Sequence, residues 1–339
     1  MDQQQVARNS QDTRLLVMQN LKLRAELSQI LEVLTCTDIP VIVLKGAALK
    51  VSVYGITDVR PIADIDLLVR PEDWYDTCHA LEKAGYLPVV VPPMFLSPFN
   101  SNDTGELTFE GKYGISIDLH WELVSVEWLR KIVLIDLDHV WKTKCSLPNP
   151  YDRGYQLEPV ALLLHLCIHL VQHSFAHPIG FRDIATILQY YQDFPWESFL
   201  MTSTLWGANT ASFAVLKTVA SQNAELVPAA VLEHLAPPQW KQKFIASVAD
   251  PKASMAGKGK YEKNRAYALH VLMADSPGRM ASFLVWLFFP GLDWLMDRYR
   301  LTNRVGSYLA VFWHPFIVLY HGLLSISIVI VNYLLQKNR

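Results

Sequence analysis

The sequence predicts an α/β (α+β) domain built on a mixed sheet, followed by a second, mostly α-helical domain. Three short runs within 41–46, 63–70 and 115–121 have the length and branched apolar composition of strands. From about residue 157 the pattern changes to long apolar runs of helical length. A chain of 339 residues that is 51% hydrophobic is large enough for two cores. We expect domains at 1–145 and 157–304 and an apolar C-terminal helix or tail at 305–339.

The N-terminal part begins with an expected helix from about Asp12 to Leu34, in which leucines recur at roughly helical spacing. A buried strand over 41–44 then ends at Lys45-Gly46, and a short helix follows to about Tyr54. Backbone N–H groups and the dipole at a helix start favour an anion such as phosphate. The Lys45-Gly46 turn is therefore a candidate phosphate site.

Further elements follow the strand at 63–70. Pro71 opens a helix that has two acidic residues in its first turn and ends near Gly85. A strand is expected at 86–91 and a loop at 92–105, where Pro, Ser and Asn are frequent. Residues 106–110 and 113–121 then alternate as a hairpin. In the second domain, Pro237-Pro238 and the stretch 250–260 are expected to be loops or a mobile connection.

Three aspartates carry the predicted chemistry. Asp64 and Asp66 are alternate residues of one strand, so their carboxylates point to the same face. In the strand at 115–121, Asp118 alternates with apolar neighbours and can face the same site. Carboxylate oxygens are the ligands that Mg²⁺ prefers, and three of them converging is costly without cations. Asp58, Asp73 and Asp76 lack such a context and are interpreted as caps or surface residues.

The ordered set resembles the DNA polymerase β-type nucleotidyltransferase superfamily, and more closely its bacterial family of uncharacterised nucleotidyltransferase-like proteins. The resemblance rests on Leu44-Lys45-Gly46, Tyr54, Arg60-Pro61, Asp64-Ile65-Asp66-Leu67-Leu68-Val69 and Asp118-Leu119-His120-Trp121, and more weakly on 163–169, His173 and 182–185. It covers about the first two thirds of the chain. Where many members of the superfamily carry Gly-Ser, this chain has Lys45-Gly46-Ala47, so Lys45 supplies a point charge where a serine hydroxyl is missing.

The resemblance implies a Mg²⁺- or Mn²⁺-dependent enzyme that transfers a nucleoside monophosphate from an NTP to a small-molecule or protein acceptor and releases pyrophosphate. Asp64, Asp66 and Asp118 would be the catalytic metal ligands. The nucleotide would be bound by Lys45, Gly46, Arg60 and His120. The alternative is a non-catalytic binding or regulatory protein of the same fold that docks a partner. Whether it does so at a membrane stays open.

Charge and cysteine content limit the partners. The formal net charge of −2 argues against a broad basic surface for long nucleic acids. The four cysteines have neither CxxC spacing nor the density of a disulfide scaffold, and the polar N-terminus does not resemble a signal peptide. We expect a cytoplasmic protein, with membrane association through its C-terminus left open.

Four histidines recur every four residues at 165, 169, 173 and 177, which would form one stripe if a single helix continued that far. Pro178 indicates that the helix ends near His177. Three interpretations stay open: buried or interdomain histidines that form hydrogen bonds, residues that contact substrate, and a zinc site. A zinc hydrolase would need a carboxylate base, for which Asp183 is the nearby candidate.

The C-terminal segment is the most apolar part. Phe316–Leu335 has no formal charge and is long enough to span a bilayer. The run Met280–Pro290 is too short to span but suits an interface, with Arg298, Arg300 and Arg304 nearby for lipid headgroups. A buried helix of a soluble protein would have a similar composition. A spanning tail, an interfacial helix and a core helix therefore stay open.

Overall fold

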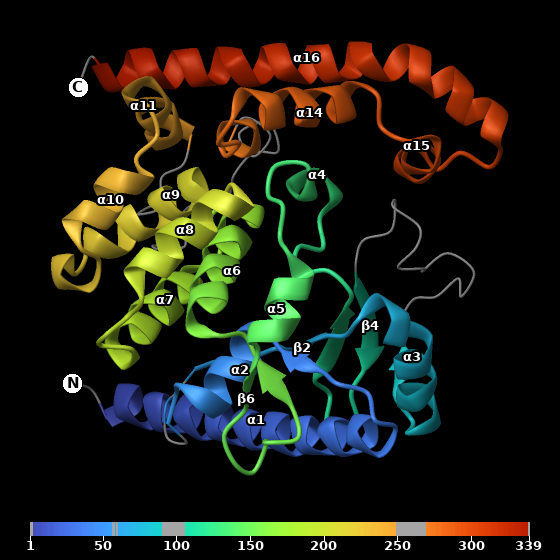
Figure 1. The fold of residues 1–339 in the computed structure, drawn as a ribbon, viewed down its shortest axis with the longest axis vertical. Helices are drawn as coiled ribbons and strands as arrows, with labels where there is room; N and C mark the ends of the chain where they lie inside the picture. Colours follow the sequence, from blue (N-terminus) through green and yellow to red (C-terminus); the bar gives the residue numbers. More distant parts are fainter. Residues whose placement is uncertain (1–2, 56–57, 59, 90–105, 249–268, 338–339) are drawn as a thin grey trace. The chain divides into compact units, whose positions relative to one another are not determined.

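The computed structural model describes residues 3–55, 58, 60–89, 106–248 and 269–337 (Figure 1). The predicted loop at 92–105 and the predicted connection at 250–260 lie outside these residues. The chain divides into two compact units, Met1–Ser125 with Leu137–Glu158, and Val126–Asp136 with Pro159–Arg339. The sequence placed this division between 145 and 157 and did not separate the short segment 126–136.

The first unit is a mixed α/β structure, as predicted. Its elements in chain order are α1 (Gln3–Cys36), β1 (Ile42–Val43), α2 (Lys45–Ser52), β2 (Asp64–Leu68), a 3-10 turn (Pro71–Asp73), α3 (Trp74–Lys83), β3 (Leu87–Pro88), β4 (Glu106–Glu110), β5 (Ser116–His120), α5 (Leu137–Thr143), β6 (Cys145–Ser146) and β7 (Tyr155–Gln156). Among the described residues the strands form one sheet in the order β3-β4-β5-β2-β1-β7-β6. The pairs β2–β5 and β1–β7 are parallel, and the other pairs are antiparallel.

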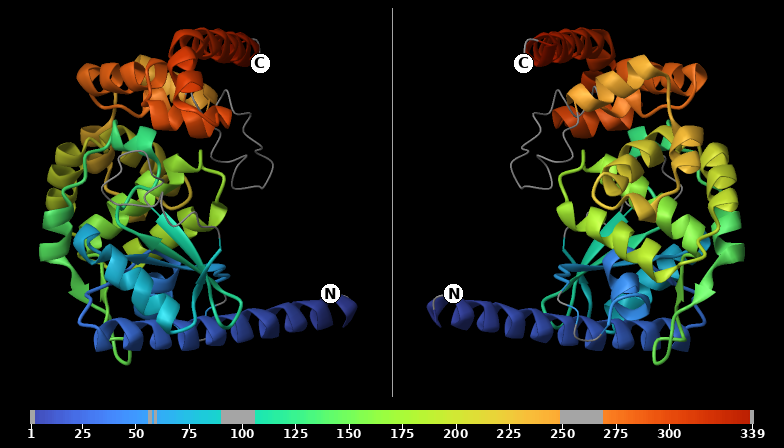
Figure 2. Two further views of the ribbon diagram at one scale, coloured as in Figure 1. Left: turned by 90° about the vertical axis from the view of Figure 1, so that its right-hand side faces the viewer. Right: turned by 90° about the vertical axis from the view of Figure 1, so that its left-hand side faces the viewer.

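Several element boundaries differ from the predicted ones. Helix α1 begins at Gln3 rather than near residue 12, and Figure 2 shows it as one long helix, drawn in dark blue. The strand expected at 86–91 is Leu87–Pro88 in the described part. Strands β6 and β7 were missed, because two-residue strands are too short to show a period of two.

One face of the sheet is apolar and covered by helices. The core combines residues of α1, α2 and α3 with the inward side chains of β2, β4 and β5, which include Ile65, Leu67, Phe109, Ile117 and Leu119. Because strand residues alternate, the residues between them point to the opposite face of the sheet. That opposite face carries the acidic residues.

The second unit is helical in the described residues. Its elements are α4 (Glu127–Arg130), α6 (Pro159–Gln172), α7 (Pro178–Tyr190), α8 (Trp196–Trp206), α9 (Asn209–Ala220), a 3-10 turn (Ala224–Leu226), α10 (Ala229–Leu235), α11 (Gln239–Val248), α14 (Pro277–Phe288), α15 (Leu292–Tyr299) and α16 (Arg304–Lys337). Pro315 lies inside α16, so the predicted apolar tail belongs to a longer helix. Within α16, the part Arg304–Leu324 is long and apolar enough to cross a membrane by length and composition.

Candidate active site

The register of β2 and β5 places the three predicted aspartates on one face of the sheet. In this parallel pair Asp66 lies opposite Asp118, and Asp64 lies opposite Ser116. The intervening residues Ile65 and Leu67 belong to the core on the other face. Three carboxylates that are up to 54 positions apart in the chain are thus brought to one surface by strand pairing.

Asp66 is the centre of a small polar network. This residue is 3% exposed, and its Oδ1 accepts a hydrogen bond from Lys45 Nζ at 2.6 Å. His120 Nε2 lies 3.0 Å from the same oxygen, and His120 Nδ1 lies 3.4 Å from Glu106 Oε2. The backbone of Lys45 has a φ of 45°, which is a strained left-handed conformation for a residue with a Cβ. Both ring nitrogens of the buried His120 face carboxylates, which suits a residue that positions Asp66.

The network shifts the pKa values of the two aspartates of β2 in opposite directions. Burial alone would raise the pKa of Asp66, but the charge of Lys45 and the His120 contact outweigh it and hold that pKa well below its usual range. Burial, followed by the negative charge of Asp66, raises the pKa of Asp64 to about 6. For Lys45, burial would lower the pKa, but the adjacent Asp66 carboxylate raises it above the ordinary value. Lys45 and Asp66 therefore form an ion pair beside a carboxyl group that resists ionisation.

Asp118 has a separate partner on the next strand. Thr108 Oγ1 of β4 donates a hydrogen bond to Asp118 Oδ1 at 2.7 Å, and the two residues are paired in the antiparallel register. Sequence reasoning missed Thr108 and Glu106 as neighbours of the site. The signal was present, since both alternate with core residues of the predicted hairpin and so share the face of Asp118.

Gly46 and Arg60 are in direct contact. A Cβ added at Gly46 would lie 2.5 Å from Arg60 Nη1, so this position has room only for glycine as Arg60 lies. Arg60 is buried, and its Nη1 donates to the carbonyl of Pro61 at 3.2 Å. Its positive charge also reaches Asp64, where it favours ionisation. Gly46 and Arg60 were both predicted to bind the nucleotide. In the structure the guanidinium of Arg60 occupies the space beside Gly46.

A buried lysine that the sequence did not single out binds two backbone carbonyls that precede Arg60 in the chain. Lys50 Nζ donates to the carbonyls of Gly55 at 3.0 Å and Asp58 at 2.5 Å. Burial, followed by the charge of Arg24, lowers the pKa of Lys50. Asp58 accepts a hydrogen bond from the Gly55 N–H at 2.5 Å, a turn role in keeping with its interpretation as a cap.

The donor set fits a divalent cation in chemical type. The three carboxylates share a face, and the charges of Asp66 and Asp118 both oppose ionisation of Asp64, a repulsion that a cation would relieve. As the side chains lie, no group of three or more His, Cys, Asp and Glu residues in the described part of the chain is close enough to hold a metal ion. Lys45 is the cation that Asp66 contacts in this arrangement.

Comparison with known proteins decides the family. The sequence model of a family described as uncharacterised nucleotidyltransferase matches residues 2–222. The chain belongs to this family. No curated protein and no solved structure matches the chain. The match includes the whole carboxylate face and ends within the helical unit, so membership in this nucleotidyltransferase family supports nucleotidyl transfer as the general activity.

The four histidines at 165, 169, 173 and 177 lie near one another, but not as a stripe on one helix. Helix α6 ends at Gln172, and His177 immediately precedes α7. Successive ring centroids are nevertheless 6.2, 4.5 and 4.6 Å apart along the row 165, 169, 173 and 177. The predicted helix was too long because residues 174 and 175 take positive φ values and turn the chain before Pro178.

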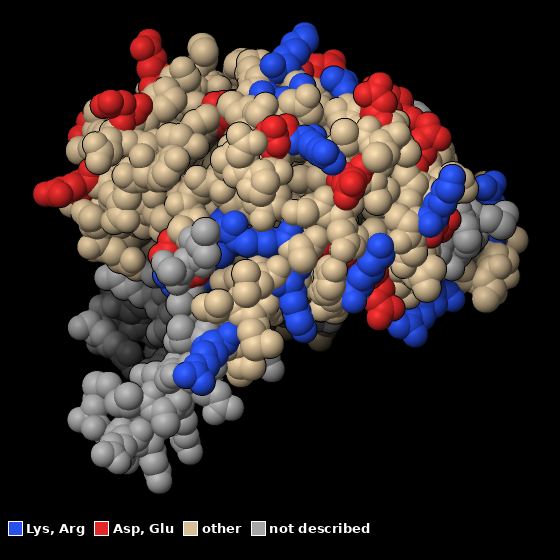
Figure 3. Space-filling model, turned by 90° about the horizontal axis from the view of Figure 1, so that it is seen from below, with Lys and Arg blue, Asp and Glu red and all other residues tan. Residues whose placement is uncertain are grey.

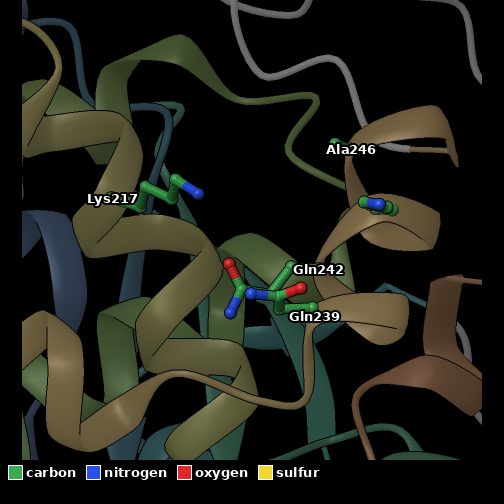
Figure 4. A pocket seen from close by; sticks show the side chains of 5 residues that line it. Lys217, Gln239, Gln242 and Ala246 are labelled. Atoms are coloured by element: carbon green, nitrogen blue, oxygen red, sulfur yellow. The ribbon is translucent and has the colours of Figure 1, made fainter.

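The helical unit holds a hollow of about 410 Å³ (Figure 4). Its lining is Lys217, Gln239, Gln242, Lys243 and Ala246. None of the predicted site residues lines it. The face shown in Figure 3 has Lys and Arg side chains interspersed with Asp, Glu and uncharged residues.

Proposed function

We propose that this nucleotidyltransferase-family protein transfers a nucleoside monophosphate from an NTP to a small-molecule or protein acceptor. The observation that carries the proposal is the parallel register that pairs Asp66 with Asp118 and leaves Asp64 on the same face. In the reaction an acceptor oxygen or nitrogen forms a bond to the α-phosphorus. The bond to the β-phosphate oxygen breaks, and pyrophosphate leaves.

Mg²⁺ or Mn²⁺ would supply charge stabilisation for the phosphates and lower the pKa of the acceptor group. Asp64, Asp66 and Asp118 would hold the cation. Asp118 accepts a hydrogen bond from Thr108, whereas Lys45 pairs with Asp66, and this leaves Asp118 suited to accept the proton of the acceptor. Lys45 and Arg60 carry the positive charge that a triphosphate needs, and both lie beside the N-terminus of α2.

His120 has a positioning role in this proposal. Its contact with Asp66 fixes one carboxylate oxygen, and its contact with Glu106 fixes the ring. It would keep Asp66 aimed when the Lys45 ammonium moves from the carboxylate toward phosphate.

The test is to incubate the purified full chain with each α-labelled NTP, Mg²⁺ or Mn²⁺ and a cell extract, and to identify the molecule that acquires label. The Asp118→Asn variant should lose turnover by about 100-fold or more with nucleotide affinity changed far less, as general-base catalysis implies. Asp76→Asn, an exposed aspartate of α3, is the matched control and should be fully active. A parallel loss of nucleotide affinity in Asp118→Asn would place Asp118 in the nucleotide site instead.

One observation favours a second function, that of a non-catalytic binding protein. The Lys45–Asp66 ion pair uses a carboxylate that the metal would need. In that case the wild-type chain would bind nucleotide, and no extract component would acquire label with any NTP or cation. Labelling by the wild type together with its loss in Asp118→Asn would reject the binding function.

A further inference from the structure

Helix α16 exposes a long apolar face. Large apolar side chains recur along it at intervals of three, four and seven residues, and most are at least half exposed. They are Val305, Tyr308, Leu309, Phe312, Phe316, Leu319, Tyr320 and Leu323. Phe312 and Phe316 are the most exposed, at 76% and 70%. With 100° per residue these positions fall on one side of the helix, which makes a continuous apolar stripe.

The opposite side of α16 is fixed to neighbouring helices of the same unit. Ser307, Ala310 and His314 are buried at spacings of three and four residues. His314 Nε2 donates to the Leu287 carbonyl at 3.0 Å, and His314 Nδ1 accepts from the Tyr299 hydroxyl at 2.6 Å. These two bonds tie α16 to α14 and α15 and use both ring nitrogens of one neutral histidine.

Aromatic contacts extend this attachment. Trp294 lies against both Trp286 and His314, at centroid distances of 5.7 and 5.5 Å. Tyr299 lies 4.2 Å from Trp313. Helices α14, α15 and α16 are therefore held together by rings packed beneath the exposed stripe.

The charges around the stripe favour a negatively charged surface. No Asp or Glu occurs from residue 304 to the end of the chain. Arg298 in the last turn of α15, Arg300 in the connection and Arg304 at the start of α16 are exposed. An apolar stripe with aromatic residues and flanking arginines matches the requirements of the headgroup region of an anionic bilayer.

We propose that the exposed face of α16 binds the surface of an anionic membrane and that Arg304–Leu324 lies in the plane of the interface rather than across the bilayer. This surface is independent of the carboxylate site and of the nucleotidyl transfer proposed for it. If Arg304–Leu324 spanned the bilayer, the His314 bonds to Leu287 and Tyr299 would have to break and Ser307 would enter hydrocarbon. An in-plane helix keeps all of these contacts.

The experiment is flotation of the full chain with vesicles of phosphatidylcholine containing phosphatidylglycerol, and with vesicles of phosphatidylcholine alone. Wild type should float with the anionic vesicles, and a Phe312→Ser/Phe316→Ser double variant should bind them about tenfold or more weakly. The matched control is Met201→Ser/Leu205→Ser, which removes apolar side chains of α8 that are 62% and 68% exposed. It should bind as wild type does. Arg300→Gln/Arg304→Gln should weaken binding at low salt and reduce its salt dependence.

Three outcomes would overturn the proposal. Vesicle binding that is absent in wild type, or unchanged in the Phe312/Phe316 variant, would reject the surface. A wild type that is dimeric by light scattering, monomeric in that variant and unbound by vesicles would assign the stripe to a second copy of the chain. Vesicle-bound protein that resists extraction at alkaline pH would reject the in-plane orientation in favour of a spanning helix.

Discussion

The carboxylate face of the sheet and the histidine row of the helical unit are both regular arrays of titratable side chains, but they are held by different interactions. On the sheet, Asp66 is joined to Lys45 and His120 by contacts of 2.6 and 3.0 Å between elements far apart in sequence. The histidine row comes from one continuous segment, and ring contacts link its members from the buried His165 to the exposed His177. On the sheet, strong charge interactions therefore join residues that are far apart in the sequence. In the histidine row, contacts join residues close in sequence, and their burial decreases from His165 to His177.

This difference predicts where substitutions should have the largest effect. Removing one charge from the sheet leaves its partner buried without a counter-ion, which is among the costliest changes a fold can undergo. Removing one ring at the exposed end of the row takes away only a partly hydrated contact. The expected effects thus fall from Asp66 through Asp64 to His177.

The largest effect is expected for Asp66→Asn. The variant should lose nucleotidyl transfer, and its free energy of unfolding should fall by roughly 3 kcal/mol, because Lys45 and His120 keep their places without the carboxylate they face. Urea unfolding of Asp66→Asn, Lys45→Met and the double variant measures this directly. Since the two side chains are in contact, the double variant should be less destabilised than the sum of the single variants by about 1–3 kcal/mol.

Asp76→Asn serves as the control for the chemical change itself, because Asp76 is an exposed residue of the same unit. Its stability should match wild type within about 0.5 kcal/mol. If Asp66→Asn unfolded at the same urea concentration as this control, the ion pair would contribute nothing to the fold.

A smaller effect of opposite sign is expected for Asp64→Asn. The pKa of Asp64 is raised to about 6 in the folded chain from an ordinary value of 3.8, so between these values the folded state holds a proton that the unfolded state has lost. Stability contributed by this group is therefore present at low pH and lost as pH rises through about 6. At pH 7, without added divalent cation, Asp64→Asn should be more stable than wild type by about 1 kcal/mol, since partial exposure screens the effect.

Unfolding midpoints measured from pH 4 to 8 would show this as a difference between the two proteins that grows toward neutral pH. Mg²⁺ should then stabilise wild type more than Asp64→Asn, because a cation favours the ionised carboxylate. A difference in unfolding midpoint that did not change with pH would contradict the raised pKa of Asp64. Equal stabilisation of both proteins by Mg²⁺ would show that Asp64 is not a metal ligand.

The two arrays also differ in how far the sequence could predict them. Alternation along a strand was sufficient to place Asp64, Asp66 and Asp118 on one face, because the side-chain period of a strand is fixed and the other face had to be apolar. Strand alternation could not show that Lys45 forms an ion pair with Asp66 or that Arg60 fills the space beside Gly46. Those contacts depend on side-chain conformations, which the strand period does not determine.

For the histidine row, residue spacing alone was not sufficient to predict the arrangement. A spacing of four implies one face only while a single helix continues, and Ser174 and Phe175 end it with left-handed backbone conformations that no residue pattern announced. Whether α16 is a core helix or an interfacial one was likewise undecided in the sequence, since both have the same composition. The burial of His314 and the exposure of Phe312 distinguish the two faces.

The smallest effect is expected at the end of the histidine row. His177→Ala removes an exposed ring whose nearest ring neighbour is His173 at 4.6 Å, so the unfolding free energy should change by less than about 0.5 kcal/mol and nucleotidyl transfer should be unaffected. The same measurement on His234→Ala, an exposed histidine of α10, provides the matched control.

Thermal midpoints should also be compared with added Zn²⁺ and with EDTA, because paired histidines four apart can chelate zinc. We expect no shift specific to His177, since no group of three ligands in the described part of the chain has metal-binding proximity. A rise in the midpoint with Zn²⁺ that disappears in His177→Ala but persists in His234→Ala would establish a zinc site and make the row functional.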